Sequence, residues 1–129
     1  MSGPLRSTIA VADDDPRILE ALQELLESAG YEVRSHSSGT SLLASGVSDV
    51  DCVITDIGMP TMDGFELRDA VKQIRPELPV ILISGRRDLS QEQNPEGLGD
   101  SLFFRKPFDG QTLLAAIDNA LGRSQSHRP

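Results

Sequence analysis

Apolar and polar residues along the chain form two alternating patterns. Short, nearly continuous apolar runs are typical of strands buried on both faces, and apolar residues that recur every three or four positions predict amphipathic helices. The runs interpreted as strands are 7–12, 32–38, 51–56, 80–84 and 101–105, and 32–38 has the weak alternation of an edge strand. The helical segments are 16–29, 39–45, 65–75 and 108–121. Strands that alternate with helices predict an α/β fold, a doubly wound parallel sheet of five strands with helices on both faces.

Local signals place the ends of the first helix. Asp15 comes directly before Pro16, which fits an N-cap followed by proline at the first helical position. Gly30 follows the last apolar position of this segment, where a helix often ends in a left-handed residue. The first helix is therefore expected to begin after Asp15 and to end before Gly30.

The segment from 85 to 100 breaks the alternation. It contains only two large apolar residues, and Pro95, Gly97 and Gly99 lie near its end. In the interior of a helix, proline costs about 3 kcal/mol and glycine about 1 kcal/mol relative to alanine. We therefore expect the fourth helix of the fold to be short or irregular.

Composition and net charge limit the domain number, the binding partners and the cellular compartment that we expect for this chain. The 129 residues suit one domain over 7–121, with a flexible N-terminus over 1–6 and a flexible tail over 122–129. The formal net charge of −8 disfavours binding to nucleic acid or to an anionic membrane surface. No apolar run approaches the roughly 20 residues of a membrane span. The single cysteine, Cys52, cannot form an internal disulfide, so we expect a reducing, cytoplasmic compartment.

Charged and reactive side chains come at the ends of four predicted strands. Asp13 and Asp14 follow the first strand, Asp56 ends the third, Ser84 ends the fourth, and Lys106 follows the fifth. The carboxyl ends of parallel strands meet at one edge of the sheet, where ligands bind. Carboxylates packed together raise each other's pKa and cost stability unless a cation compensates them. Mg²⁺ prefers oxygen ligands, so the sequence predicts a magnesium site at this edge.

This set of residues suits phosphoryl transfer, in which catalysis is mostly positioning and stabilisation of charge. Asp56 stands alone at the end of its strand and is the best candidate for a carboxylate nucleophile. Asp13 and Asp14 are then the pair on the metal side. Lys106 supplies a compact positive charge, and Ser84 can donate a hydrogen bond to a phosphoryl oxygen.

Four stretches of the chain resemble a known family in their order and spacing. They are "VADDDP" (11–16), "VITDIGMPTMDG" (53–64), "VILIS" (80–84) and "FRKPF" (104–108). Together they resemble a receiver domain of the response regulators of bacterial two-component systems, over about residues 7–121. Three segments resemble FixJ-type receivers in particular: "TDIGMPTMDGFEL", "ISGRRD" and "KPFDGQTLLAAI". The resemblance implies the flavodoxin-like strand order 2-1-3-4-5.

The resemblance also implies a role for each acid. Asp56 is expected to accept the phosphoryl group. Asp13 and Asp14 are expected to bind Mg²⁺, with Asp14 and Asp56 as direct carboxylate ligands. The backbone carbonyl of Gly58 is expected to be a third ligand.

Three further residues receive expected roles from the same resemblance. Ser84 is expected to be the switch hydroxyl, which moves toward the phosphoryl group. Phe103 falls where the family places an aromatic side chain that turns inward during the switch. Lys106 is expected to contact the phosphoryl group, and the peptide bond between Lys106 and Pro107 is expected to be cis.

The partners implied by the resemblance are proteins. The phosphoryl donor is expected to be a phosphohistidine on a histidine kinase or a histidine phosphotransfer protein. The output is expected to be a downstream protein effector or an appended output domain, with no direct contact to nucleic acid or membrane. The chain ends soon after its last predicted helix, so it is either a stand-alone switch or a part of a longer regulator, and its oligomeric state is open.

Two other functions compete with a phosphorylated switch. "ADDDP" contains Asp13-x-Asp15, the spacing of a haloacid-dehalogenase-type phosphatase, in which Asp13 is the nucleophile. Against this, Asp15 is needed as a helix cap and Asp56 has no role there. The other alternative is an interaction module that is never phosphorylated, which the complete set of site residues disfavours. We expect no enzyme activity beyond the chain's own phosphorylation and dephosphorylation.

Overall fold

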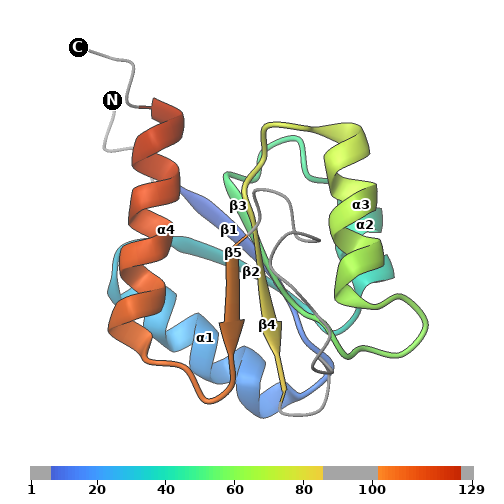
Figure 1. The fold of residues 1–129 in the computed structure, drawn as a ribbon, viewed down its shortest axis with the longest axis horizontal. Helices are drawn as coiled ribbons and strands as arrows, with labels where there is room; N and C mark the ends of the chain where they lie inside the picture. Colours follow the sequence, from blue (N-terminus) through green and yellow to red (C-terminus); the bar gives the residue numbers. More distant parts are fainter. Residues whose placement is uncertain (1–6, 86–101, 126–129) are drawn as a thin grey trace.

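One parallel sheet organises the chain in the computed structural model, which describes residues 7–85 and 102–125. Its five strands lie in the order β2-β1-β3-β4-β5, the order implied by the resemblance (Figure 1). The strands are β1 (Thr8–Ala12), β2 (Glu32–His36), β3 (Cys52–Asp56), β4 (Val80–Ser84) and β5 (Leu102–Arg105). The helices within the described ranges are α1 (Pro16–Ser28), α2 (Gly39–Ser45), α3 (Gly64–Ile74) and α4 (Gly110–Gln125). The expected short or irregular fourth helix lies outside the described residues, as do 1–6 and 126–129.

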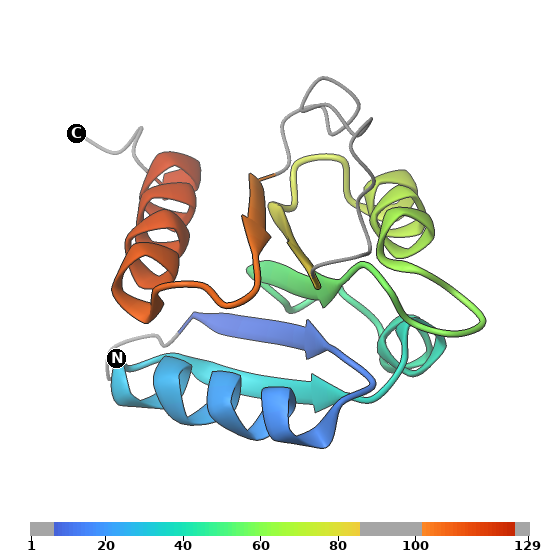
Figure 2. The same cartoon turned by 60° about the horizontal axis from the view of Figure 1, so that its bottom comes forward.

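Helices cover both faces of the sheet, as predicted. Helices α1 and α4 lie on one face, and α2 and α3 lie on the other (Figures 1 and 2). Neighbouring residues of β1 therefore enter different cores: Ile9 packs with α1 and α4, and Ala10 packs with α2 and α3. Because β1, β3 and β4 are buried on both faces, they are apolar at nearly every position. No helix within the two described ranges has the length and apolar character needed to cross a membrane.

Side-chain caps fix where the helices begin. Asp15 is the N-cap of α1, and its carboxylate accepts a hydrogen bond from the N–H of Arg17 at 2.9 Å, which confirms the expected cap. Asp63 and Glu66 form a capping box at the start of α3, with distances of 2.8 and 3.0 Å. The N-terminus of α3 is therefore held firmly next to the strand ends.

The helix after β5 differs from the expectation at both ends. It begins at Gly110 rather than at 108, because Asp109 accepts the N–H of Thr112 at 2.9 Å and caps it. It continues through Gly122 to Gln125, so residues 122–125, expected to belong to a flexible tail, are helical. A single glycine costs only about 1 kcal/mol in a helix, which neighbouring contacts can offset.

Candidate functional site

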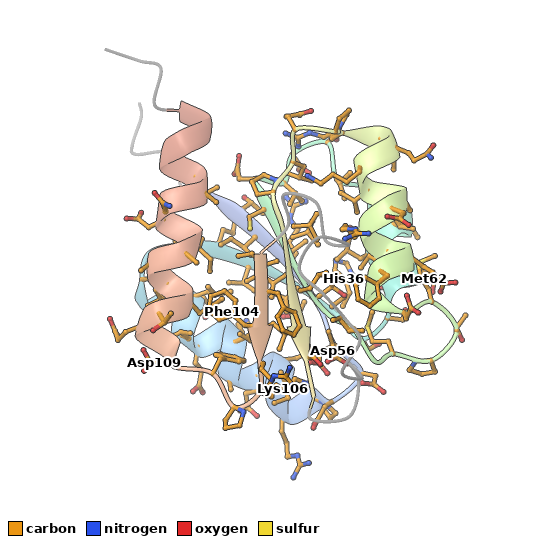
Figure 3. All side chains as sticks on the ribbon, in the orientation of Figure 1. His36, Asp56, Met62, Phe104, Lys106 and Asp109 are labelled. Carbon is orange, nitrogen blue, oxygen red and sulfur yellow. The ribbon has the colours of Figure 1, made fainter. Side chains whose placement is uncertain are left out.

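The expected site residues meet at the edge formed by the carboxyl ends of the strands. Backbone hydrogen bonds extend the sheet one residue beyond three strands, from Asp13 to His36 (3.1 Å), from Ile57 to Ile83 (2.8 Å) and from Lys106 to Ser84 (2.8 Å). Side chains carried on such a fixed backbone are positioned more firmly than side chains on loops. Asp56 and Lys106 lie together at this edge, near the tips of the arrows of β4 and β5 (Figure 3).

Three carboxylates gather there, as the sequence predicts. One carboxylate oxygen from each of Asp13, Asp14 and Asp56 lies within 4.8 Å of the others. Asp13 and Asp56 are buried, with 1% and 5% of their surfaces exposed, whereas Asp14 is exposed. Burial raises the pKa of Asp13, although the N–H of Asp15, which donates to Oδ1 of Asp13 at 2.9 Å, and the charge of Lys106 act in the opposite direction.

This acidic group can hold a metal ion. All of its donors are hard carboxylate oxygens, which suit a divalent cation such as Mg²⁺. The two buried carboxylates supply fixed negative charge, and the exposed Asp14 lies on the side open to solvent. A cation that keeps several of its waters fits a site of this kind, half buried and half open.

Lys106 bridges the buried acids. Its Nζ lies 3.0 Å from Oδ1 of Asp56 and 3.2 Å from Oδ2 of Asp13. Burial alone would lower the pKa of Lys106, but the hydrogen bond to Asp56 and the charges of Asp13 and Asp56 outweigh it and raise the pKa. Lys106 is therefore held as an ammonium against the carboxylate expected to react. The peptide bond between Lys106 and Pro107 is cis, as the resemblance implies.

The residues expected to act as the switch lie on β4, which pairs with β3, and on β5, which pairs with β4. Ser84 is fully buried at the end of β4, and its Oγ donates to the carbonyl of Gly85 at 2.7 Å. Phe103 on β5 is half-buried against the core under α2 and α3, and the guanidinium carbon of Arg105 lies 5.8 Å from the centre of its ring. Gly58, expected to supply a carbonyl ligand, is exposed in the loop after β3.

Two residues close to Asp56 were missed by the sequence reasoning. Thr55 is fully buried, and its Oγ1 donates to the carbonyl of Asp56 at 3.0 Å. A Cβ on Gly64 would lie 2.6 Å from the same carbonyl oxygen. A glycine directly after an N-cap aspartate, where alanine would favour the helix, was the available signal of a close backbone approach.

The arrangement does not support the haloacid-dehalogenase alternative. That reading needs the side chain of Asp15 as a free acid or base next to Asp13. Instead Asp15 caps α1 and pairs with Arg17, whose Nε lies 3.4 Å from Oδ1 of Asp15. Asp56, which has no role in that reading, lies among the acids at the strand edge.

Comparisons with known proteins identify the family. The family model for the response regulator receiver domain matches residues 9–118. The chain is 37% identical over 117 residues to the transcriptional regulatory protein FixJ of Azorhizobium caulinodans, covering 90% of this chain and 56% of that protein. It is 37% identical over 116 residues to the response regulator protein TmoT of Ectopseudomonas mendocina, covering 89% of this chain and 53% of that protein.

A solved structure agrees with these relatives. The fold is similar to a response regulator receiver domain protein from Clostridium thermocellum, with a TM-score of 0.82 and 34% identity, covering 92% of this chain and 97% of that one. The chain spans about half the length of the curated relatives named above. With the family model matched over most of its length, the chain belongs to the receiver-domain family of two-component response regulators.

Proposed function

We propose that Asp56 accepts a phosphoryl group in a Mg²⁺-dependent reaction and that its phosphorylation switches the binding of a partner. The observation that carries this proposal is the contact of 3.0 Å between Nζ of Lys106 and Oδ1 of Asp56, inside a group of three carboxylates. A buried carboxylate held by an ammonium, next to a candidate metal site, has what phosphoryl transfer requires: a nucleophile and fixed positive charge.

The metal site is proposed to consist of Asp13, Asp14, Asp56 and the carbonyl of Gly58. Asp14 and Asp56 bind the ion directly, and Asp13 supplies charge and holds Lys106 through the contact of 3.2 Å. When bound, Mg²⁺ neutralises the clustered acids and the oxygens of the phosphoryl group. The carboxylate donor set on the described strand ends supports this assignment.

In the proposed reaction a carboxylate oxygen of Asp56 attacks the phosphorus of a phosphohistidine. The new bond joins that oxygen to phosphorus, the bond between phosphorus and the imidazole nitrogen breaks, and the nitrogen keeps the electron pair. Lys106 stabilises the negative charge on the phosphoryl oxygens, since its raised pKa keeps it protonated. Ser84, buried at the end of the neighbouring strand, is proposed to turn from the carbonyl of Gly85 to donate to a phosphoryl oxygen.

The donor is proposed to be a histidine kinase or a histidine phosphotransfer protein. The movement of Ser84 is proposed to let Phe103, half-buried on β5, turn inward and alter the surface that a partner contacts. The partner is a downstream protein or an output domain joined to this one, since the relatives named above are about twice as long. The chain catalyses only its own phosphorylation and dephosphorylation in this proposal.

Acetyl phosphate with and without MgCl₂ tests the proposal. Intact-mass analysis should find one added phosphoryl group per chain that depends on Mg²⁺ and is removed by hydroxylamine, as expected for an acyl phosphate. Asp56→Asn should abolish the addition. Asp69→Asn is the matched control, because Asp69 is an exposed aspartate on α3 and outside the acidic group. Labelling that survives in Asp56→Asn would overturn the proposal.

A further inference from the structure

The first residue of α3 lies against the backbone of the candidate phosphoryl acceptor. A Cβ built on Gly64 would lie 2.6 Å from the carbonyl oxygen of Asp56 and 2.7 Å from Cα of Ile57. Cβ atoms in proteins do not approach other backbone atoms so closely, so any side chain at this position would force the strand end or the helix to move. Glycine is therefore needed here for a close approach of two backbones.

The same carbonyl oxygen is held from a second direction. Oγ1 of Thr55 donates to the carbonyl of Asp56 at 3.0 Å. Thr55 is fully buried, so water does not compete for this hydrogen bond. One peptide plane, between Asp56 and Ile57, is thus fixed by a hydroxyl and by the contact with Gly64.

The next peptide plane is fixed by Gly64 itself. Its N–H donates to the carbonyl of Ile57 at 2.9 Å. Gly64 is in turn fixed, because it follows Asp63, the N-cap whose capping box with Glu66 closes the first turn of α3. Both peptide planes between Asp56 and Gly58 are therefore tied to neighbouring elements rather than free in a loop.

We propose that Thr55 and Gly64 are positioning residues for the chemistry at Asp56: they set the direction of its carboxylate and the place of the Gly58 carbonyl. The inference deepens the proposed function and rests on it. Peptide planes are rigid, so fixing two in sequence leaves few ways for Asp56 and Gly58 to change their relative placement. A displacement of about 1 Å at a reacting group is enough to cost on the order of a hundredfold in rate.

Four variants distinguish an effect on the positioning of Asp56 from a general loss of folding stability. Thr55→Val removes the hydroxyl and keeps the branched shape, so the buried site stays filled. Thr55→Ser returns the hydroxyl. Gly64→Ala adds the Cβ that meets the backbone of Asp56. Gly122→Ala is the matched control, because it is also a glycine within a helix but has nothing within 4 Å of an added Cβ.

The first readout is the affinity for Mg²⁺ alone, without a phosphoryl donor. It is measured from the NMR chemical shifts of the backbone amides between Asp56 and Gly64 as Mg²⁺ is added. The titrations are done at a temperature at which circular dichroism shows that every variant is folded. We expect Thr55→Val and Gly64→Ala to weaken Mg²⁺ binding by about tenfold or more, the size typical of lost partners around a metal site. Thr55→Ser should recover most of the affinity, and Gly122→Ala should match the wild type. The rate of phosphorylation by acetyl phosphate should fall in the same order.

A second readout needs no metal. Amide hydrogen exchange at Gly64 should accelerate in metal-free Thr55→Val, because the strand end that accepts its hydrogen bond is then less firmly held. If Gly64→Ala does not fold, Thr55→Val alone carries the test. Wild-type Mg²⁺ affinity and wild-type exchange in folded Thr55→Val would overturn the inference. If the wild type itself is never phosphorylated, the proposed function fails, while metal binding and exchange still decide the positioning role.

Discussion

Lys106 reaches Asp56 across an intervening strand: its Nζ lies 3.0 Å from Oδ1 of Asp56, although β4 separates β5 from β3 in the sheet. The same nitrogen contacts Asp13 at 3.2 Å, so one ammonium compensates two buried carboxylates from β3 and the end of β1. Removing one partner of such a group leaves charge buried without compensation, which costs more than the loss of a surface ion pair. The stability of the metal-free domain should therefore depend on Lys106.

Lys106→Met should lower the free energy of unfolding by about 3 kcal/mol at pH 7 in urea denaturation without metal. The loss should be smaller at pH 5. Burial raises the pKa of Asp13 in the folded domain, so protonation of Asp13 favours the native state as the pH falls through that pKa. Protonation also removes the negative charge that Lys106→Met leaves without a partner.

Arg34→Gln is the contrasting variant for this experiment. Arg34 and Asp49 form an ion pair with distances of 3.0 and 2.9 Å, but it is exposed to solvent. Its loss should cost less than about 1 kcal/mol. Equal losses for Lys106→Met and Arg34→Gln, or a loss in Lys106→Met that does not change with pH, would contradict the account of the buried group.

Asp14→Asn should separate metal binding from folding. Magnesium that binds only the native state should raise the free energy of unfolding of the wild type, by about 2.7 kcal/mol at a concentration of 100 times the Kd. Asp14→Asn should lose this gain, because it removes one of the three clustered carboxylates. Without metal it should be at least as stable as the wild type, because one like charge has left the cluster. Asp69→Asn should keep the full Mg²⁺ effect, and a full effect in Asp14→Asn would rule out its direct ligation.

Tyr31 offers a pH titration in which one residue supplies the signal. The chain has one tyrosine and no tryptophan, so ultraviolet absorbance follows Tyr31 alone. Burial raises the pKa of its phenol above the ordinary 10.0, and the charge of Asp118 and a hydrogen bond with it raise the pKa further. Asp118→Asn should therefore lower the midpoint of the titration toward 10.0 without restoring it fully.

The sign of the effect on stability follows from the same shift. The folded phenol ionises at higher pH than the unfolded one, so the native state loses stability as the pH rises above the unfolded pKa near 10.0. Asp118→Asn should lose less stability over that range. An unchanged titration midpoint in Asp118→Asn would show that Asp118 on α4 does not raise the pKa of Tyr31.

The positions of Asp13, Asp56 and Lys106 were predictable because hydrophobic pattern and topology act together. Each follows or ends a buried strand, and parallel strands bring their carboxyl ends to one edge. The pattern alone does not give the order of the strands, and only the resemblance placed β4 between β3 and β5. The distances that make Lys106 a bridge depend on side-chain packing, which spacing does not encode.

Other features escaped the sequence because tertiary contacts decide them. Ile74 has the spacing of the buried face of α3 but is 59% exposed. Leu78, from the loop that follows α3, enters the core instead, with 1% exposed. The roles of Thr55 and Gly64 arise from how closely α3 approaches the end of β3, and periodicity carries no information about that approach.

The loop after Asp56 contains a strained residue that can be relieved. Thr61 has φ of 71°, which is unfavourable for a β-branched side chain, and it is exposed. Thr61→Gly should relieve about 1–2 kcal/mol of strain in the left-handed backbone. Glycine has greater freedom in the unfolded chain, which offsets about 0.5–1 kcal/mol of this gain. A net gain of about 1 kcal/mol in the free energy of unfolding should follow and is measured by urea denaturation.

Gly46→Ala makes the opposite kind of change, because it places a side chain where the backbone also has a positive φ. Gly46 has φ of 92° at the end of α2, and nothing lies within 4 Å of an added Cβ, so any loss comes from the backbone and not from a clash. With ψ of 154°, Gly46 lies in a region that side chains rarely adopt, at a cost of about 1–3 kcal/mol. Alanine regains about 0.5–1 kcal/mol through its smaller freedom when unfolded. Gly46→Ala should therefore lose about 1 kcal/mol in the free energy of unfolding. If Thr61→Gly fails to gain stability while Gly46→Ala loses it, the contacts of the Thr61 side chain, and not its backbone, decide the stability of the loop next to Asp56.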